Sequence, residues 1–215
     1  MITQQEKLKH IADVIHTGLL KPLGFKRRRN TFNRKTEDGL IQVINFQASF
    51  YNSESTGGIF WVNIGVCIPE IEEVTVKLYG GSSNFIPEYK CQIRARVGHL
   101  NKDRRNVEFS LDENLEATSA EILRYLRDFE IPFFHQLDTH DKVLKRLESY
   151  KPSDPFICLT PLIDAGIVYW HQGNKIKAQE LFTKHYNDYV SDPKNPGPGH
   201  GEFMKELAQE FGLEI

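Results

Sequence analysis

Residues 40–50 read LIQVINFQASF, and this stretch decides the fold because its side chains alternate between apolar and polar. A period of two residues is typical of a β-strand that buries one of its faces. Asn45, Gln47 and Ser49 point to one face, and the opposite face carries Leu40, Ile44, Phe46, Ala48 and Phe50. Gln42 is the exception, a polar side chain on the apolar face. The stretch therefore predicts a strand with one buried and one exposed surface.

The same alternation recurs on both sides of this strand. Asp38-Gly39 is a turn signal that predicts a hairpin joining residues 30–36 to residues 40–50. Residues 60–66 and 91–97 also alternate, and residues 106–111 predict a shorter strand. Antiparallel sheets commonly bury one face only. We therefore expect an α+β fold, with a mainly antiparallel sheet, helices on one face, and a carboxy-terminal helical hairpin annex.

Helix-start signals flank the predicted sheet. Thr3 and Glu6 have the spacing of a capping box, in which each side chain satisfies a free backbone amide of the other residue. Thr118 and Glu121 have the same spacing before a helix that Pro132 is expected to end. Between the strands, the carboxylates of residues 70–73 indicate a solvated turn.

The carboxy-terminal part is expected to be helical. Residues 151–155 contain two prolines and predict a linker. Helices are expected over residues 139–149, 160–171, 175–190 and 201–211. We therefore divide the chain into an α+β domain, residues 1–150, and a helical annex, residues 156–215, packed on the first part.

A candidate binding surface lies on the exposed face of the predicted sheet. Amides, an indole and guanidinium groups gather there: Asn45, Gln47, Trp61, Asn63, Arg94 and Arg96. The neighbouring stretch KRRRNTFNRK, residues 26–35, holds six cations. Treated as one strand, it places Arg27 and Arg29 on the same face, so we add both to the candidate site. A solvated edge strand explains the same charges without any partner, since charged edges discourage aggregation.

Overall composition narrows the class of protein. The 215 residues carry a formal net charge of −2, which argues against general polyanion binding, so any basic attraction must be local. The cysteines, at 67, 91 and 158, form no CxxC pair, and neither a signal peptide nor a membrane-spanning run is found. We expect a cytoplasmic protein without membrane contact, cofactor or metal.

Common catalytic motifs are missing from the sequence. It contains no GxxxxGK[ST], GxGxxG, HExxH or GxSxG, so no catalytic residue is nominated. Residues 135–141, HQLDTHD, offer metal-ligand types. They lie between two predicted helices, where Asp138 or Thr139 would serve as an N-cap, and we favour capping over a metal.

Four segments resemble a family of bacterial proteins. GLLKPLGFKRRRNTF, GLIQVINFQASFYN, FWVNIGVCIPE and CQIRARVG are similar to domain-of-unknown-function family 4304, over roughly residues 8–135. The resemblance implies a small bacterial cytoplasmic protein with an α+β fold, and it implies no reaction. Residues 162–182 resemble a single tetratricopeptide repeat, with Gly166, Tyr169, Gly173, Ala178 and Phe182 at matching spacings.

These observations favour a non-enzymatic protein-interaction module. By analogy with other α+β domains of this kind, we expect an immunity protein that neutralises a bacterial toxin by direct binding. One alternative is a nucleic-acid-binding protein that uses residues 26–35. A second alternative is an enzyme acting on a phosphorylated small molecule through Arg94 and Arg96.

Overall fold

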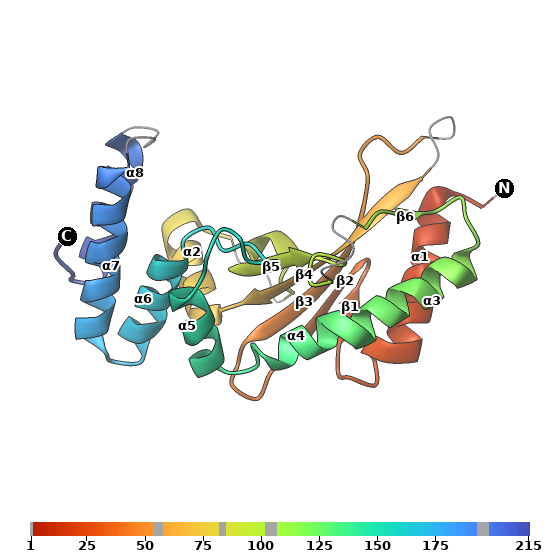
Figure 1. Ribbon diagram of the computed structural model, residues 1–215, viewed down its shortest axis with the longest axis horizontal. Coiled ribbons are helices and arrows are strands. Elements are labelled where there is room, and N and C mark those ends of the chain that lie inside the picture. Colours follow the sequence, from red (N-terminus) through yellow and green to blue (C-terminus); the bar gives the residue numbers. More distant parts are fainter. Residues whose placement is uncertain (1, 54–57, 82–84, 102–106, 193–197) are drawn as a thin grey trace.

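The protein was studied as a computed structural model, which describes residues 2–53, 58–81, 85–101, 107–192 and 198–215. A six-stranded antiparallel sheet forms its centre (Figure 1). The strands lie in the order β1-β2-β3-β4-β5, and β6 pairs with β4. Their bounds are β1 Lys26–Arg28, β2 Thr31–Lys35, β3 Ile41–Ala48, β4 Ile59–Cys67, β5 Ile93–Arg96 and β6 Phe109–Ser110. The predicted α+β fold is therefore confirmed.

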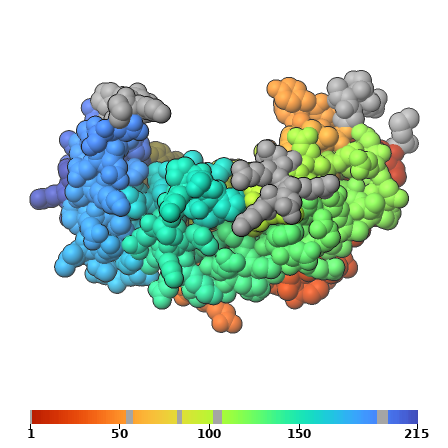
Figure 2. Space-filling view, viewed as in Figure 1, coloured from red at the N-terminus to blue at the C-terminus, as the bar shows by residue number. Residues whose placement is uncertain are grey.

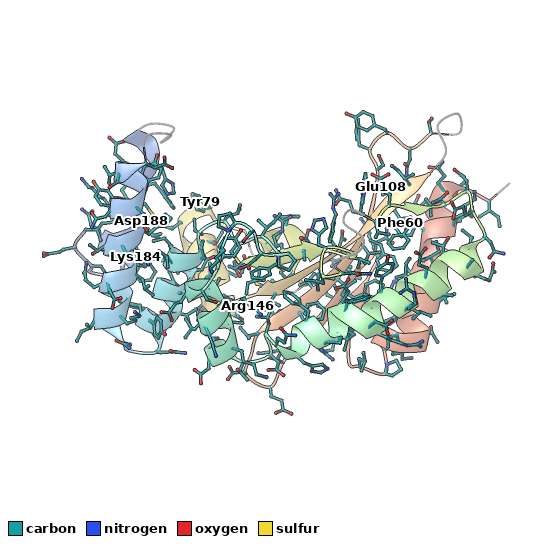
Figure 3. The ribbon with its side chains drawn as sticks, viewed as in Figure 1. Phe60, Tyr79, Glu108, Arg146, Lys184 and Asp188 are labelled. Atoms are coloured by element: carbon teal, nitrogen blue, oxygen red, sulfur yellow. The ribbon has the colours of Figure 1, made fainter. Side chains whose placement is uncertain are left out.

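One face of the sheet is covered by helices that pack on its apolar side chains. These helices are α1 Gln4–Ile15, α3 Leu115–Tyr125 and α4 Ile131–His135, and in Figure 1 they lie on one side of the sheet. Ile44, Phe46 and Phe60 point into this core and are buried. Phe60 lies among side chains packed between β4 and α3 (Figure 3), where its ring contacts Phe109. Gln42, the polar exception, is also fully buried.

Local signals set most helix ends. The capping box of Thr3 and Glu6 opens α1, as predicted, and the helix continues through a π-helical turn, His16–Leu20. The second predicted capping box is wrong, because Asn114 accepts the free amides at the start of α3 and Thr118 lies buried within the helix. Pro132 does not end the helical path. A π-helical turn, Leu126–Glu130, leads into α4, where proline is tolerated in the first turn.

A helix stands where the sequence indicated a solvated turn. Residues Pro69–Tyr79 form α2, with Pro69 in its first turn. Proline is favoured there because the first amides of a helix have no partner within it. Glu70 and Glu72 lie in that first turn and form ion pairs with side chains elsewhere in the chain. The expectation of a turn was therefore wrong.

The carboxy-terminal helices extend the molecule beyond the sheet. They are α5 His140–Glu148, α6 Pro161–His171, α7 Lys175–Ser191 and α8 Pro198–Glu210. Helix α6 packs on α5, α2 and α7, and α8 packs on α7. Figure 2 shows a crescent whose hollow lies between these helices and the tip of the sheet. The hollow lies on the side of the sheet away from α1 and α3 (Figures 1 and 2).

The basic stretch forms a hairpin instead of one strand. Strands β1 and β2 pair with each other, and Arg27 stands opposite Phe32 on the helix-covered face. Arg29 lies in the connecting turn, with a φ of 54°. Arg27 and Arg29 therefore do not share a face as the prediction of one continuous strand required, because the turn interrupts the alternation: Arg27 lies on the helix-covered face, and Arg29 is exposed in the turn. Strand β1 is the edge of the sheet, and its charges need not be buried.

Candidate functional site

The predicted polar side chains of three neighbouring strands do share one face of the sheet. The register pairs Gln47 with Trp61 across β3 and β4, and Asn63 with Arg96 across β4 and β5. Since side chains alternate along a strand, every second residue of these strands points to the same surface. We call the surface formed by Asn45, Gln47, Trp61, Asn63, Arg94 and Arg96 the polar face.

Trp61 and Arg96 form a fixed pair on the polar face. The Arg96 guanidinium lies 4.9 Å from the centre of the Trp61 ring. Arg96 Nε also donates to the Asn63 side chain, at 3.2 Å, and Asn63 donates to Gln47 at 2.7 Å. Asn63 is only 4% exposed, whereas Trp61 and Arg96 are half-buried. The buried amide therefore holds Arg96 in place, and the guanidinium of Arg96 contacts the indole of Trp61 while both side chains stay partly exposed.

The chain itself covers the other end of the polar face. Residues 85–91 cross that end, and Ile86 and Cys91 form a small core with Val43 and Cys67. Asn33 of β2 fixes the segment by two hydrogen bonds, because its side chain accepts from the Ile86 amide at 2.7 Å and donates to the Ile86 carbonyl at 2.9 Å. We call residues 85–91 the covering segment. It leaves Asn45, Gln47, Trp61 and Arg96 partly or fully exposed.

Two of the predicted binding residues, Arg94 and Arg27, form ion pairs with other residues of the chain. Arg94 binds Glu88 of the covering segment through two hydrogen bonds, of 2.8 and 3.2 Å, which raise the pKa of Arg94. Arg27 pairs with Asp13 of α1. Arg94 and Arg27 therefore stabilise the fold and are less suited to bind a partner.

A cavity of about 680 Å³ lies between the polar face and the covering segment. Its lining comes from the end of β1 and the turn after it, from β2 and β3, from Gly81 and from the covering segment. The lining residues are Arg28, Arg29, Asn30, Thr31, Asn45, Phe46, Gln47, Gly81, Phe85, Pro87, Tyr89 and Lys90. None of these carries a carboxylate. We call this the basic cavity.

The cations of the basic cavity differ in whether a carboxylate of the chain already pairs with them. Lys90 pairs with Glu72 of α2, and this contact raises the pKa of Lys90. Arg28 and Arg29 are exposed, and within the described residues no carboxylate pairs with either side chain. The cavity therefore presents two uncompensated guanidinium groups beside amides and aromatic rings, a combination suited to carboxylate or phosphate groups.

A second cavity adjoins the first. It has a volume of about 290 Å³, and Tyr89 and Lys90 line both. Asp164 of α6 lies on its far side, where burial raises the pKa of its carboxyl group to about 7 although the Thr160 hydroxyl opposes this shift. The Asp164 side chain is therefore only partly ionised near neutral pH.

The histidine-rich stretch, residues 135–141, caps a helix. Thr139 accepts the Lys142 amide at the start of α5, which confirms the interpretation as a cap. His140 is bound on both sides, with Nδ1 2.8 Å from Asp38 and Nε2 2.9 Å from Glu70. Burial alone would lower the pKa of His140, but the two carboxylates outweigh it and raise the pKa. The imidazolium thus joins α5 to α2 and to the turn between β2 and β3.

The cysteine thiols are poorly suited to nucleophilic chemistry. All three are buried and free. Burial raises the pKa of Cys67 and of Cys158 to about 12, and it raises the pKa of Cys91 well above its ordinary value. Thiolate is the reactive form of cysteine, so these three residues stay protonated near neutral pH.

The sequence places the protein in a family. Residues 16–136 match the family model described as domain of unknown function (DUF4304), which covers more than half of the chain and includes β1 to β6. The chain belongs to this family. No curated protein and no solved structure matches the sequence of this chain. Within the described residues, every helix is too short or too polar to cross a membrane.

Several residues of the basic cavity were missed when the candidate site was predicted from the sequence, among them Phe85, Tyr89 and Lys90. Arg28 was part of the nucleic-acid alternative but not of the candidate site, because the hairpin turn was not recognised and Arg28 was assigned to the opposite face from Arg27 and Arg29. Phe85, Tyr89 and Lys90 precede β5 in the chain, where nothing in the local pattern indicates that they return to the polar face. Pro87 favours an extended conformation in the residue before it, but this does not indicate which part of the sheet the segment contacts.

Proposed function

We propose that this member of the DUF4304 family is a non-enzymatic module that binds an acidic surface of a partner protein through the polar face and the basic cavity. The observation that carries the proposal is the basic cavity, where Arg28 and Arg29 stand unpaired and no carboxylate is present among the described lining residues. Aspartate and glutamate side chains would bind these guanidinium groups, preferably in bidentate geometry.

The Trp61–Arg96 pair supports a protein partner. Tryptophan and arginine are enriched among the residues that dominate binding energy at protein interfaces. Here Asn63 already fixes the arginine over the indole, so little side-chain freedom is lost when a partner binds. The hollow of the crescent gives a convex partner access to this side of the molecule (Figure 2).

We test the surface first by cross-linking. A photoreactive amino acid at position 61 should capture an acidic protein in cells of the source organism, and the same amino acid at exposed Arg127 of the opposite side should not. The captured protein, once purified, should bind the wild-type chain and lose at least about tenfold in affinity for Arg28→Glu/Arg29→Glu, since each charged contact contributes about 1.5–3 kcal/mol. Unchanged binding by the double variant would refute the proposal.

The matched control is Arg127→Glu, because Arg127 is an exposed arginine of the π-helical turn after α3. It changes the net charge in the same direction but leaves the polar face intact. Equal loss of binding in Arg127→Glu and in a single Arg28→Glu variant would show a general charge effect and would contradict a local site.

The more specific proposal is that the partner is a toxin domain and that the chain is its immunity protein. Its support is the analogy with other small α+β domains, together with the basic cavity as a surface that could occlude an acidic site. The test is co-expression with a toxin encoded by a neighbouring gene. Equal cell death with and without this chain would reject the immunity role, while the cross-linking result would still decide the binding surface.

A second candidate function is binding of single-stranded nucleic acid, favoured by the aromatic rings in the basic cavity. Phe85, Tyr89 and the nearby Trp61 could stack on bases while Arg28 and Arg29 contact phosphates. Fluorescence anisotropy with labelled single-stranded DNA and RNA at increasing salt tests it. Binding that weakens with salt, and does so less steeply in Arg28→Glu/Arg29→Glu, would favour nucleic acid over protein.

A further inference from the structure

Two histidines from different helices face each other far from the polar face. His185 of α7 and His200 of α8 approach with their Nε2 atoms 3.4 Å apart. Both side chains are half-buried. Around them, the His200 ring lies 4.5 Å from the Tyr189 ring and 6.2 Å from the Phe203 ring. The two imidazoles therefore meet in a partly dry space with aromatic walls.

The distance between the two nitrogens is long for a hydrogen bond but fits shared coordination. Hydrogen bonds from N–H groups are normally about 2.7–3.2 Å long. Two imidazole nitrogens that bind one tetrahedral zinc ion at about 2.0–2.1 Å lie about 3.3–3.4 Å apart. The 3.4 Å separation of His185 and His200 matches the second arrangement.

One carboxylate lies near the pair. Asp188 is on the next turn of α7 from His185 and interacts with it electrostatically. Asp188, labelled on α7 in Figure 3, contributes negative charge that would stabilise a bound cation.

We propose that His185 and His200 bind a zinc ion that joins α7 to α8. Within the described residues, no group of three or more histidine, cysteine, aspartate or glutamate side chains is close enough to hold a metal. The pair would therefore supply two ligands, and water would fill the remaining positions. A site with two protein ligands binds a metal reversibly. Its affinity for the metal decreases as the pH is lowered, because protonated imidazole cannot coordinate.

The test uses the full chain without a histidine tag. Addition of zinc chloride should raise the melting temperature of the wild-type protein, and chelation should reverse the increase. His185→Asn and His200→Asn should each weaken zinc binding at least about tenfold by calorimetry, since losing even a supporting contact around a metal costs about 10- to 100-fold. His10→Asn, which changes an exposed histidine of α1, is the matched control and should bind zinc normally.

A second measurement needs no variant. Electron paramagnetic resonance of the copper(II)-loaded wild-type chain should show coupling to two imidazole nitrogens, because imidazole also binds copper well. Coupling to a single nitrogen, or zinc affinity that is unchanged in both variants, would overturn the proposal. So would a wild-type melting temperature that does not respond to millimolar zinc.

Discussion

Glu130 offers a sharp test of the buried electrostatics. It ends the π-helical turn Leu126–Glu130 and is 0% exposed. Neither of its carboxyl oxygens has a hydrogen-bond partner among the described residues. Burial raises the pKa of Glu130 to about 8, and the nearby Gly98 amide opposes this shift only in part. In the folded chain Glu130 is therefore mostly protonated at pH 7, whereas in the unfolded chain it is ionised.

The cost to stability follows from this difference in pKa. Between pH 4.5, the ordinary value, and about pH 8, the unfolded state releases a proton that the folded state keeps. Each pH unit in this range lowers the free energy of unfolding by about 1.4 kcal/mol, which amounts to about 3 kcal/mol at pH 7. Glu130→Gln cannot ionise, so the variant should be more stable at pH 7 by up to about 3 kcal/mol.

The assay is urea unfolding at pH 5, 6, 7 and 8. The gain of the Glu130→Gln variant over the wild type should be small at pH 5 and should grow toward pH 8. Glu108→Gln changes an exposed carboxylate (Figure 3) and serves as the control, with little effect at any pH. A gain that stays constant with pH, or a variant less stable than the wild type at pH 7, would refute the assignment of Glu130 as a buried acid.

Three further variants probe other parts of the fold. His140→Gln should cost about 1–3 kcal/mol below pH 6.5, where the raised pKa keeps the wild-type imidazolium charged, and thermal melts should show the cost shrinking as pH rises through that pKa. Gly166→Ala should lose about 1–3 kcal/mol in chemical denaturation, since its Cβ would lie 2.7 Å from the Phe182 ring, whereas Gly18→Ala meets open space and should lose nothing. Phe60→Ala should cost about 3–5 kcal/mol by the same method, and a cost below about 1 kcal/mol would contradict its place in the core.

The strands of the sheet were predictable because their pattern is local. Alternation in residues 40–50 and 60–66 predicted β3 and β4, and Asp38-Gly39 predicted the turn before β3. Even the exception has a structural reason. Gln42 accepts a hydrogen bond from Arg34 and donates one to the Phe134 carbonyl, so a buried amide joins β2, β3 and α4.

The candidate site was predicted only in part, because its missing half depends on contacts between distant segments. The covering segment reaches the polar face through Asn33, which is 53 residues away from Ile86 along the chain. A run of cations also concealed the turn between β1 and β2, since arginine carries no signal for the positive φ that Arg29 adopts. Helix α2 was missed because its glutamates were taken as solvated, whereas distant cations bind two of them.

The small core beneath the covering segment gives the protein a built-in chemical reporter. Cys91 belongs to that core, and Gly65 is there because a Cβ at position 65 would lie within 2.6 Å of Cys91. The thiol can meet an alkylating reagent only when residues 85–91 lift away from the sheet. Its rate of alkylation in native buffer therefore measures how often that opening occurs, and a bound partner that presses on the segment would slow the reaction.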